Sequence, residues 1–349
     1  MSRTYPDYAQ PLWRRALFSR EGAVIALLVA VLVWAINGVA YFGSQLTMTY
    51  LFLDIAPILL IALPMTLVIV SGEIDLSVAS IVGLSSVLVG VLVDHGASVP
   101  VAGALALLAG LACGALNGFL VAYVGLPSLA VTIGTLALFR GIAVGVLGTT
   151  AITSFPDKWG DLAKAEIGST GVPVIVIAFA LLAVAFTLLL HFSSFGRGVY
   201  DIGLNIEAAE FTGVPVRRTK FTLFVLSGLV SAFAGIYFTL RFSSSRGDNA
   251  TGLELQIIAA VLLGGVSIFG GRGKLHGVIA GVLLIGVISS ALRLQGVTIN
   301  VVNIIIGLLL VASVMSTSVL AWVSDAAARR NNRGDSPELV PAGVANQER

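Results

Sequence analysis

The residue types that could carry out chemistry are few in this chain, and their spacing matches no catalytic motif. The sequence contains neither a Gly-x-Ser-x-Gly nucleophile turn nor a His-Glu-x-x-His metal motif. The three histidines stand alone, and the single cysteine, Cys113, lies in an apolar run. The pair Gly273-Lys274 is followed by Leu275, where a phosphate-binding loop needs Ser or Thr. We therefore expect no catalytic residue, no metal, no cofactor and no ATP site in this chain.

Two charged residues lie inside segments that are otherwise apolar, Asp54 and Arg140. Such a charge is costly in lipid and should face water or an opposite charge. For Asp54 the alternatives are bonding to solute hydroxyls or pairing with a basic residue. For Arg140 the alternatives are lining a path, pairing with Asp54, or extending its aliphatic side chain outward so that the guanidinium reaches water. Asn117 and Gln256 are neutral polar residues in or near apolar segments, and their simpler role is hydrogen bonding between helices.

A short acidic turn, with Glu73, Asp75 and Ser77, separates two long apolar segments. Asp75 comes just before the second of them and is placed to cap its helix and to favour the helix dipole. The alternative is a functional contact with a partner subunit or with a second copy of the chain.

Residues 193–220 (SSFGRGVYDIGLNIEAAEFTGVPVRRTK) form a long polar stretch between apolar segments. Asn205 is a typical helix N-cap, a helical pattern follows it, and Gly213 and Pro215 end that pattern. The stretch therefore predicts a short helix outside the apolar bundle. This helix either inserts into a groove on a soluble partner or belongs to a solvated connection.

The composition indicates where these residues lie. Of the 349 residues, 57% are apolar and 11% are charged, whereas soluble domains have about 45–50% apolar and about 25% charged residues. A soluble enzyme is therefore excluded, and a net charge of +2 gives little support for nucleic-acid binding. Gly110, Gly114 and Gly118 repeat at the spacing of closely packed helices in lipid. We predict an all-α polytopic membrane protein.

About ten segments are predicted to span the membrane, because roughly 20 apolar residues cross about 30 Å of hydrocarbon. Nine or eleven spans are the alternatives, since the first two segments are only a few residues apart. Residues 1–21 then form an N-terminal segment, residues 22–322 the transmembrane domain, and residues 323–349 a polar tail that we expect to be disordered. The predicted spans are residues 22–43, 46–71, 74–94, 99–124, 127–148, 172–192, 219–240, 255–271, 275–293 and 298–322.

The distribution of Lys and Arg predicts the orientation, because these residues stay mainly on the cytoplasmic side. With ten spans, residues 3–20, 197–220, 272–274 and 329–349 fall on one side and hold most of the basic residues. We therefore place both termini and the loop 193–220 in the cytoplasm. The loop 149–171, with a short helix predicted at 157–165, is the longest external connection.

Four stretches, in order along the chain, resemble landmarks of one family, the ribose-type permeases of ATP-binding-cassette (ABC) importers. Residues 72–78 (GEIDLSV) resemble the GGIDLSVG signature of that branch, and residues 125–128 and 132–135 resemble a second landmark. Residues 207–213 resemble its EAA-x-x-x-G loop, and residues 265–273 (GVSIFGGRG) its GxSIxGGxG stretch. Glu73 and Ala79 stand where many sugar permeases carry Gly. Residues 62–66 are closer to the rhamnose and autoinducer-2 sub-branches than to ribose permeases.

This resemblance implies the permease subunit of an ABC importer in a bacterial cell (inner) membrane. In the family the EAA loop is a coupling helix that seats in the ATPase, which assigns Glu207, Ala208, Ala209 and Gly213 to ATPase coupling. The implied partners are a cytoplasmic ATPase subunit, a second permease copy or paralogue, and an external (periplasmic) substrate-binding protein. ATP hydrolysis would then belong to the partner and not to this chain.

The expected solute is a monosaccharide of the rhamnose, ribose or xylose type, or an autoinducer-2-like molecule, because the sparse buried charge suits a neutral solute. The candidate translocation path comprises Asp54, Arg140, Asn117 and Gln256. A branched-chain amino-acid permease of the same superfamily would instead handle a zwitterion. An ion-coupled secondary transporter is the rival from another class, with Asp54 and Asp75 as carriers of the coupling ion and no ATPase.

Overall fold

The chain folds into α-helices in a computed structural model that describes residues 19–312 and 315. Within these residues, the only β-pairing is two isolated bridges, Ile152 with Ser245 and Glu166 with Pro173. The all-α fold is confirmed. The helices are α2 (Arg20–Gly38), α3 (Gln45–Val70), α4 (Val78–Asp94), α5 (Val99–Ala122), α6 (Ser128–Leu147), α7 (Asp157–Lys164), α8 (Ile175–His191), α9 (Ser194–Leu204), α10 (Ile206–Phe211), α11 (Val216–Phe242), α12 (Leu253–Leu263), α13 (Leu275–Leu294) and an unlabelled helix Ile299–Ala312.

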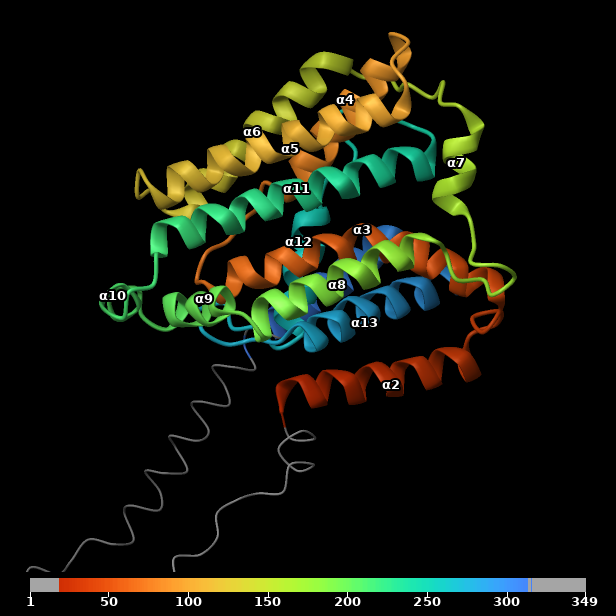
Figure 1. The fold of residues 1–349 in the computed structure, drawn as a ribbon. Helices are drawn as coiled ribbons and strands as arrows, with labels where there is room; N and C mark the ends of the chain where they lie inside the picture. Colours follow the sequence, from red (N-terminus) through yellow and green to blue (C-terminus); the bar gives the residue numbers. More distant parts are fainter. Residues whose placement is uncertain (1–18, 313–314, 316–349) are drawn as a thin grey trace, which may run out of the picture.

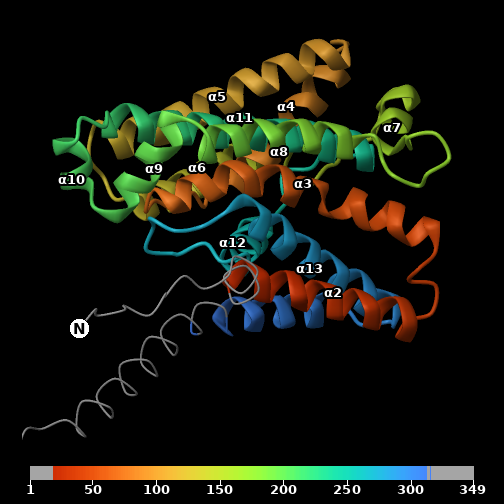
Figure 2. The same ribbon diagram turned by 60° about the horizontal axis from the view of Figure 1, so that its bottom comes forward.

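The long helices run side by side, and the short helices α10 and α7 lie at opposite ends of the bundle (Figure 1). We refer to these as the α10 end and the α7 end. Figures 1 and 2 show α4, α5 and α11 on one side of α3, and α13 and α2 on the other. α7 confirms the short helix predicted at 157–165.

α3 forms the centre of the bundle. It is apolar on all sides, and nearly all of it is buried, as expected of a helix with no polar face. α2 is also strongly apolar but exposes Ile25, Val29 and Val33. Exposed apolar surface of this kind suits contact with lipid or with another membrane chain.

Six of the described helices are long and apolar enough to cross a membrane, and seven if the pair α8–α9, bent by 65°, counts as one span. α4, α12 and the helix Ile299–Ala312 are apolar but shorter. Each predicted segment contains a helix, but the count of about ten crossings is not confirmed. The largest correction concerns the span predicted at 255–271, where α12 ends at Leu263 and an irregular segment follows.

α5 and α11 pack closely through glycines. A Cβ atom on Gly114 would lie 2.3 Å from the carbonyl oxygen of Phe224, and one on Gly228 would lie 2.3 Å from that of Gly110. Only hydrogen fits at these positions, so the backbones approach as the glycine spacing predicted. Most of the predicted N-terminal segment 1–21, and all of the tail 323–349, lie outside the described residues.

Candidate functional site

The short helix predicted outside the bundle is α10 (Figure 1). Asn205 is its N-cap, with Oδ1 accepting a hydrogen bond from the N–H of Ala208 at 2.9 Å. After the helix ends at Phe211, Gly213 adopts a φ of +86°, a conformation that favours glycine. Both predicted ends of this helix are therefore confirmed.

One side of α10 is fixed to the rest of the chain. Ala209 is buried and packs against Ile202 of α9 and Val216, the first residue of α11. Since the segment between α10 and α11 is only a few residues long, a displacement of α10 must also move the start of α11.

The other side of α10 is exposed. Glu207 and Ala208 are exposed, and Phe211 is 94% exposed. A hollow of about 500 Å³ separates α10 from the acidic turn after α3, and Glu73, Glu207 and Phe269 contribute to its lining. The helix, the acidic turn and Phe269, which is 82% exposed, thus share one surface at the α10 end.

Glu73 of the acidic turn pairs with Lys220 near the start of α11. The Lys220 Nζ lies 2.5 Å from Glu73 Oε1, and only 12% and 13% of the two side chains are exposed. The carboxylate of Glu73 is therefore engaged within the chain. Lys220 was missed as a partner because it was grouped with the basic residues of the loop 193–220.

Asp75 is fully buried and forms hydrogen bonds across the bundle. Its Oδ1 accepts from the N–H and the hydroxyl of Ser77 at 3.0 and 2.6 Å, and its Oδ2 accepts from the Ser227 hydroxyl of α11 at 2.7 Å. Ser77 directly precedes α4, and its own side chain forms no capping bond. Because Asp75 accepts the N–H of Ser77, its carboxylate satisfies a donor at the start of α4, in agreement with the predicted capping role.

Asn117 of α5 joins this network, because its Nδ2 donates to the Ser77 hydroxyl at 2.8 Å. The expected hydrogen bonding between segments is thus observed for Asn117. Asn117 connects the acidic turn to α5. Lys220 and Ser227 connect it to α11 at two positions along that helix. These two residues are separated by about 10 Å along the α11 axis.

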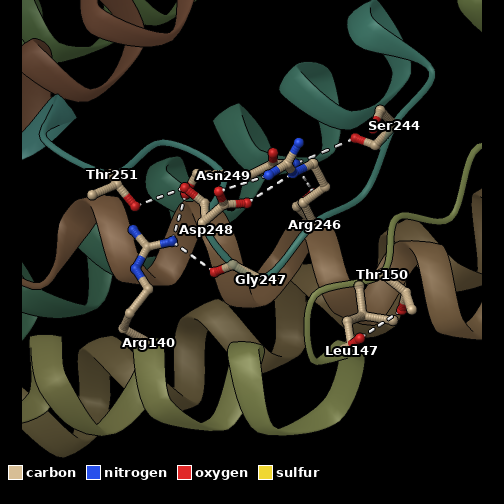
Figure 3. Close-up of polar contacts among 10 residues, drawn as sticks. Arg140, Leu147, Thr150, Ser244, Arg246, Gly247, Asp248, Asn249 and Thr251 are labelled. Carbon is tan, nitrogen blue, oxygen red and sulfur yellow. Dashed lines mark hydrogen bonds and ion pairs between the residues drawn. The ribbon is translucent and has the colours of Figure 1, made fainter.

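Arg140 bonds to backbone carbonyls of the loop that follows α11 (Figure 3). Its Nη1 donates to Gly247 O at 2.9 Å and to Asn249 O at 2.6 Å, and its Nη2 donates to Ala79 O at 3.1 Å. Arg140 therefore fastens the loop that follows α11 onto α6 and α4, and the alternative of pairing with Asp54 does not occur.

Asp54 pairs with two other arginines. Its Oδ1 lies 2.5 Å from the Nη2 of Arg241, and its Oδ2 lies 2.9 Å from the Nη2 of Arg293. The pairing alternative predicted for Asp54 is observed, with Arg241 and Arg293 as partners that the sequence alone did not identify. The feature of the sequence that could have indicated these partners is that Arg241 and Arg293 stand at the ends of apolar segments.

Gln256 lies on α12, and its Nε2 is 3.4 Å from the Oδ1 of Asn303, so it bonds between helices as expected. It also lines a hollow of about 450 Å³ whose wall includes Arg246, Asp248 and Thr251. Arg246 donates to both carboxylate oxygens of Asp248 at 2.9 Å, and Figure 3 shows the two side chains facing one another.

The four predicted path residues are not brought together. Asp54, Arg140, Asn117 and Gln256 have different hydrogen-bond partners and share none of them. Within the described part of the chain, no group of three or more His, Cys, Asp or Glu side chains is placed to hold a metal.

Residues 47–314 match the family model described as the branched-chain amino acid transport system permease component. The chain is 34% identical over 334 residues to the Autoinducer 2 import system permease protein LsrD of Salmonella paratyphi A, covering 92% of this chain and 98% of that protein. It is 38% identical over 266 residues to the protein of the same name from Escherichia coli, covering 74% and 80%. No solved structure matches the chain.

Proposed function

The chain belongs to the family of branched-chain amino acid transport system permease components, and on this basis we propose how it imports its solute. It is the permease subunit of an ABC importer and a multi-pass protein of the bacterial inner membrane. We propose that it carries a small, neutral, polyhydroxylated solute, delivered by an external binding protein and driven by a separate ATPase subunit.

The observation that carries the mechanism is the geometry of α10. Its exposed side, with Glu207, Ala208 and Phe211, is free to contact another protein, while Ala209 is anchored to α9 and α11. In the proposed mechanism the ATPase binds this exposed side. Closure of the ATPase dimer on ATP then moves α10, and α11 moves with it.

The same proposal fixes the orientation. If the ATPase binds α10, the α10 end faces the cytoplasm and the α7 end faces outward, in agreement with the distribution of Lys and Arg. Both termini are then cytoplasmic and the ten helical segments cross in alternation. A second permease copy or paralogue completes the path, as the resemblance implies.

The proposed solute class rests on two observations. The relatives are named as autoinducer 2 import permeases, and Arg246 and Asp248, the exposed charges of the hollow of about 450 Å³, neutralise each other. A neutral solute with many hydroxyl groups needs donors and acceptors but no net charge. The candidates are autoinducer-2 and monosaccharides such as rhamnose, ribose and xylose.

The test is binding-protein-dependent uptake of these four labelled solutes in cells with and without this chain, with its ATPase and binding protein co-expressed. We expect one solute to be taken up only when the chain is present. ATP depletion should abolish this uptake, and collapse of the proton gradient should not. Uptake that instead follows the proton or sodium gradient would show an ion-coupled transporter and overturn the proposal.

A further inference from the structure

The loop between α11 and α12, residues 243–252, turns back into the bundle. Its successive residues lie against α4 at different levels. Ser245 lies against Gly90, where a Cβ atom would be 2.5 Å from the Ser245 side chain, and Asn249 lies against Gly83, where a Cβ would be 3.1 Å from Asn249 O. Gly83 and Gly90 are separated by about 10 Å along the helix axis, so the loop descends by that distance from the α7 end.

The loop is firmly held at this depth. The Ser245 hydroxyl donates to Ser86 O at 2.8 Å, and the Asn249 Nδ2 donates to the Ser86 hydroxyl at 2.9 Å. Arg140 binds the carbonyls of Gly247 and Asn249 from the side of α6 (Figure 3). The missing side chain of Gly83 provides the space that the Arg140 guanidinium occupies.

The short length of α12 agrees with this descent. Its 11 residues extend about 16 Å, roughly half of a hydrocarbon core about 30 Å thick. Gly264, directly after α12, packs against Gly277 near the start of α13, so α12 ends towards the α10 end. Figure 1 shows α12 in the middle of the bundle, between the two ends. The loop and α12 together therefore make one crossing, which is irregular in its first part and helical in its second.

Charged side chains are exposed on this irregular part. Arg246 and Asp248 are 53% and 61% exposed, at a level between Gly90 and Gly83 of α4. Exposed charges and irregular backbone at membrane depth are tolerated only beside water or inside protein. The hollow that these residues line is therefore incompatible with contact to lipid tails.

We infer that the loop 243–252 and the first turn of α12 form one wall of the water-filled solute path, with a subsite for a neutral polyhydroxylated molecule. Arg246, Asp248, Thr251 and Gln256 supply donors and acceptors for hydroxyl groups, and Phe238 supplies an apolar ring face. The hollow of about 450 Å³ lies within the range of about 300–1,000 Å³ that is usual for small-molecule sites. The choice of solute class rests on the proposed function, whereas the presence of water beside the loop does not.

The first experiment is thiol labelling, which this chain makes simple because Cys113 is its only cysteine. In a Cys113→Ala background, Thr251→Cys and Gln256→Cys are compared with Leu181→Cys, which is 68% exposed within the apolar helix α8. A charged, membrane-impermeant thiosulfonate is applied to the protein in membranes. We expect both loop-side cysteines to react at least about tenfold faster than Leu181→Cys, because the reactive thiolate forms in water and not in lipid.

If neither Thr251→Cys nor Gln256→Cys reacts faster than Leu181→Cys, the inference is wrong and the loop is covered by lipid or by another protein. This labelling needs neither ATPase nor solute, so its outcome is independent of the uptake test of the proposed function. Two loop-side positions are used so that the loss of one local bond, such as that from Thr251 to Asp248 O, does not decide the result.

The second experiment tests the subsite. Labelling of Thr251→Cys is repeated in the presence of ribose, rhamnose, xylose or autoinducer-2, with leucine as a zwitterionic control. We expect at least one of the four hydroxylated solutes to slow the reaction several-fold and leucine to leave it unchanged. Equal protection by leucine, or no protection by any of the four, would overturn the solute subsite.

Discussion

At the scale of single residues, Glu73 and Lys220 connect the acidic turn after α3 to the start of α11. Lys220 is one helical turn beyond Val216, the residue on which Ala209 of α10 packs. A movement of α10 therefore reaches the acidic turn through this ion pair.

We predict that Glu73→Lys and Lys220→Glu each lower ATP-driven uptake strongly and that the double exchange restores most of it. Each single change places two like charges in contact where little water reaches, at a cost on the order of 1–4 kcal/mol. The measurement is uptake, together with solute-stimulated ATP hydrolysis, in the reconstituted importer. If the double variant shows no more uptake than either single variant, the two residues do not act through their ion pair. The yield of purified protein is the control for a loss of folding.

A second residue-scale prediction concerns Asp54, which neutralises Arg241 and Arg293. Arg241 is 7% exposed and Arg293 is 42% exposed, so removal of Asp54 leaves a buried positive charge without a partner. We expect Asp54→Asn to lower the midpoint of thermal unfolding in detergent clearly more than Arg293→Gln. The cost should fall below the about 3–5 kcal/mol known for fully buried pairs, because Asp54 itself is 29% exposed. Equal midpoints for the two variants would contradict this account.

At the scale of the element, α10 combines a fixed side and a free side. We predict that Glu207→Arg on the free side abolishes ATP-driven uptake while leaving the amount of protein in the membrane unchanged. Asp201→Arg, also exposed but on α9, is the matched control and should retain uptake. Co-purification of the ATPase provides the second measurement and should fail only for Glu207→Arg. Normal uptake by Glu207→Arg would remove α10 from the proposed coupling surface.

The contact between α5 and α11 gives a prediction about stability. A Cβ atom on Gly114 would lie 2.3 Å from Phe224 O, whereas one on Gly134 of α6 would meet no atom within 4 Å. We therefore expect Gly114→Ala to lower the thermal unfolding midpoint and Gly134→Ala to leave it unchanged or raise it, since alanine favours a helix over glycine by about 1 kcal/mol. The same substitution at two helical glycines isolates the effect of packing. A similar shift for both variants would mean that α5 and α11 separate easily.

At the scale of the whole molecule, the sequence predicted the helical segments well because span length and apolar composition are local properties. It predicted both ends of α10 for the same reason, since Asn205 and Gly213 act on their own neighbours. The partners of Asp54 and Glu73 in their ion pairs were not predicted, because those partners are distant in the chain. The descent of the loop 243–252 into the bundle was not predicted, because hydropathy does not indicate how deep a polar loop lies. The predicted span 255–271 also began after this loop.

The orientation of the molecule is the last point that the fold makes testable. α11 joins the two ends of the bundle, starting beside α10 and ending where Gly160 of α7 approaches Ser243. Its 27 residues extend about 40 Å, close to the about 40–45 Å of a bilayer with its headgroup regions. α10 and α7 must therefore lie on opposite sides of the membrane, and labelling at one position on each determines the orientation.

We predict that, in a Cys113→Ala background, Lys158→Cys on α7 reacts with an impermeant thiol reagent on intact spheroplasts. Phe211→Cys on α10 should react only after the membrane is permeabilised, although Phe211 is 94% exposed in the isolated chain. Co-expression of the ATPase should then slow the reaction of Phe211→Cys and leave that of Lys158→Cys unchanged. The opposite pattern of accessibility would invert the topology, and it would place α10 on the wrong side of the membrane for any cytoplasmic ATPase.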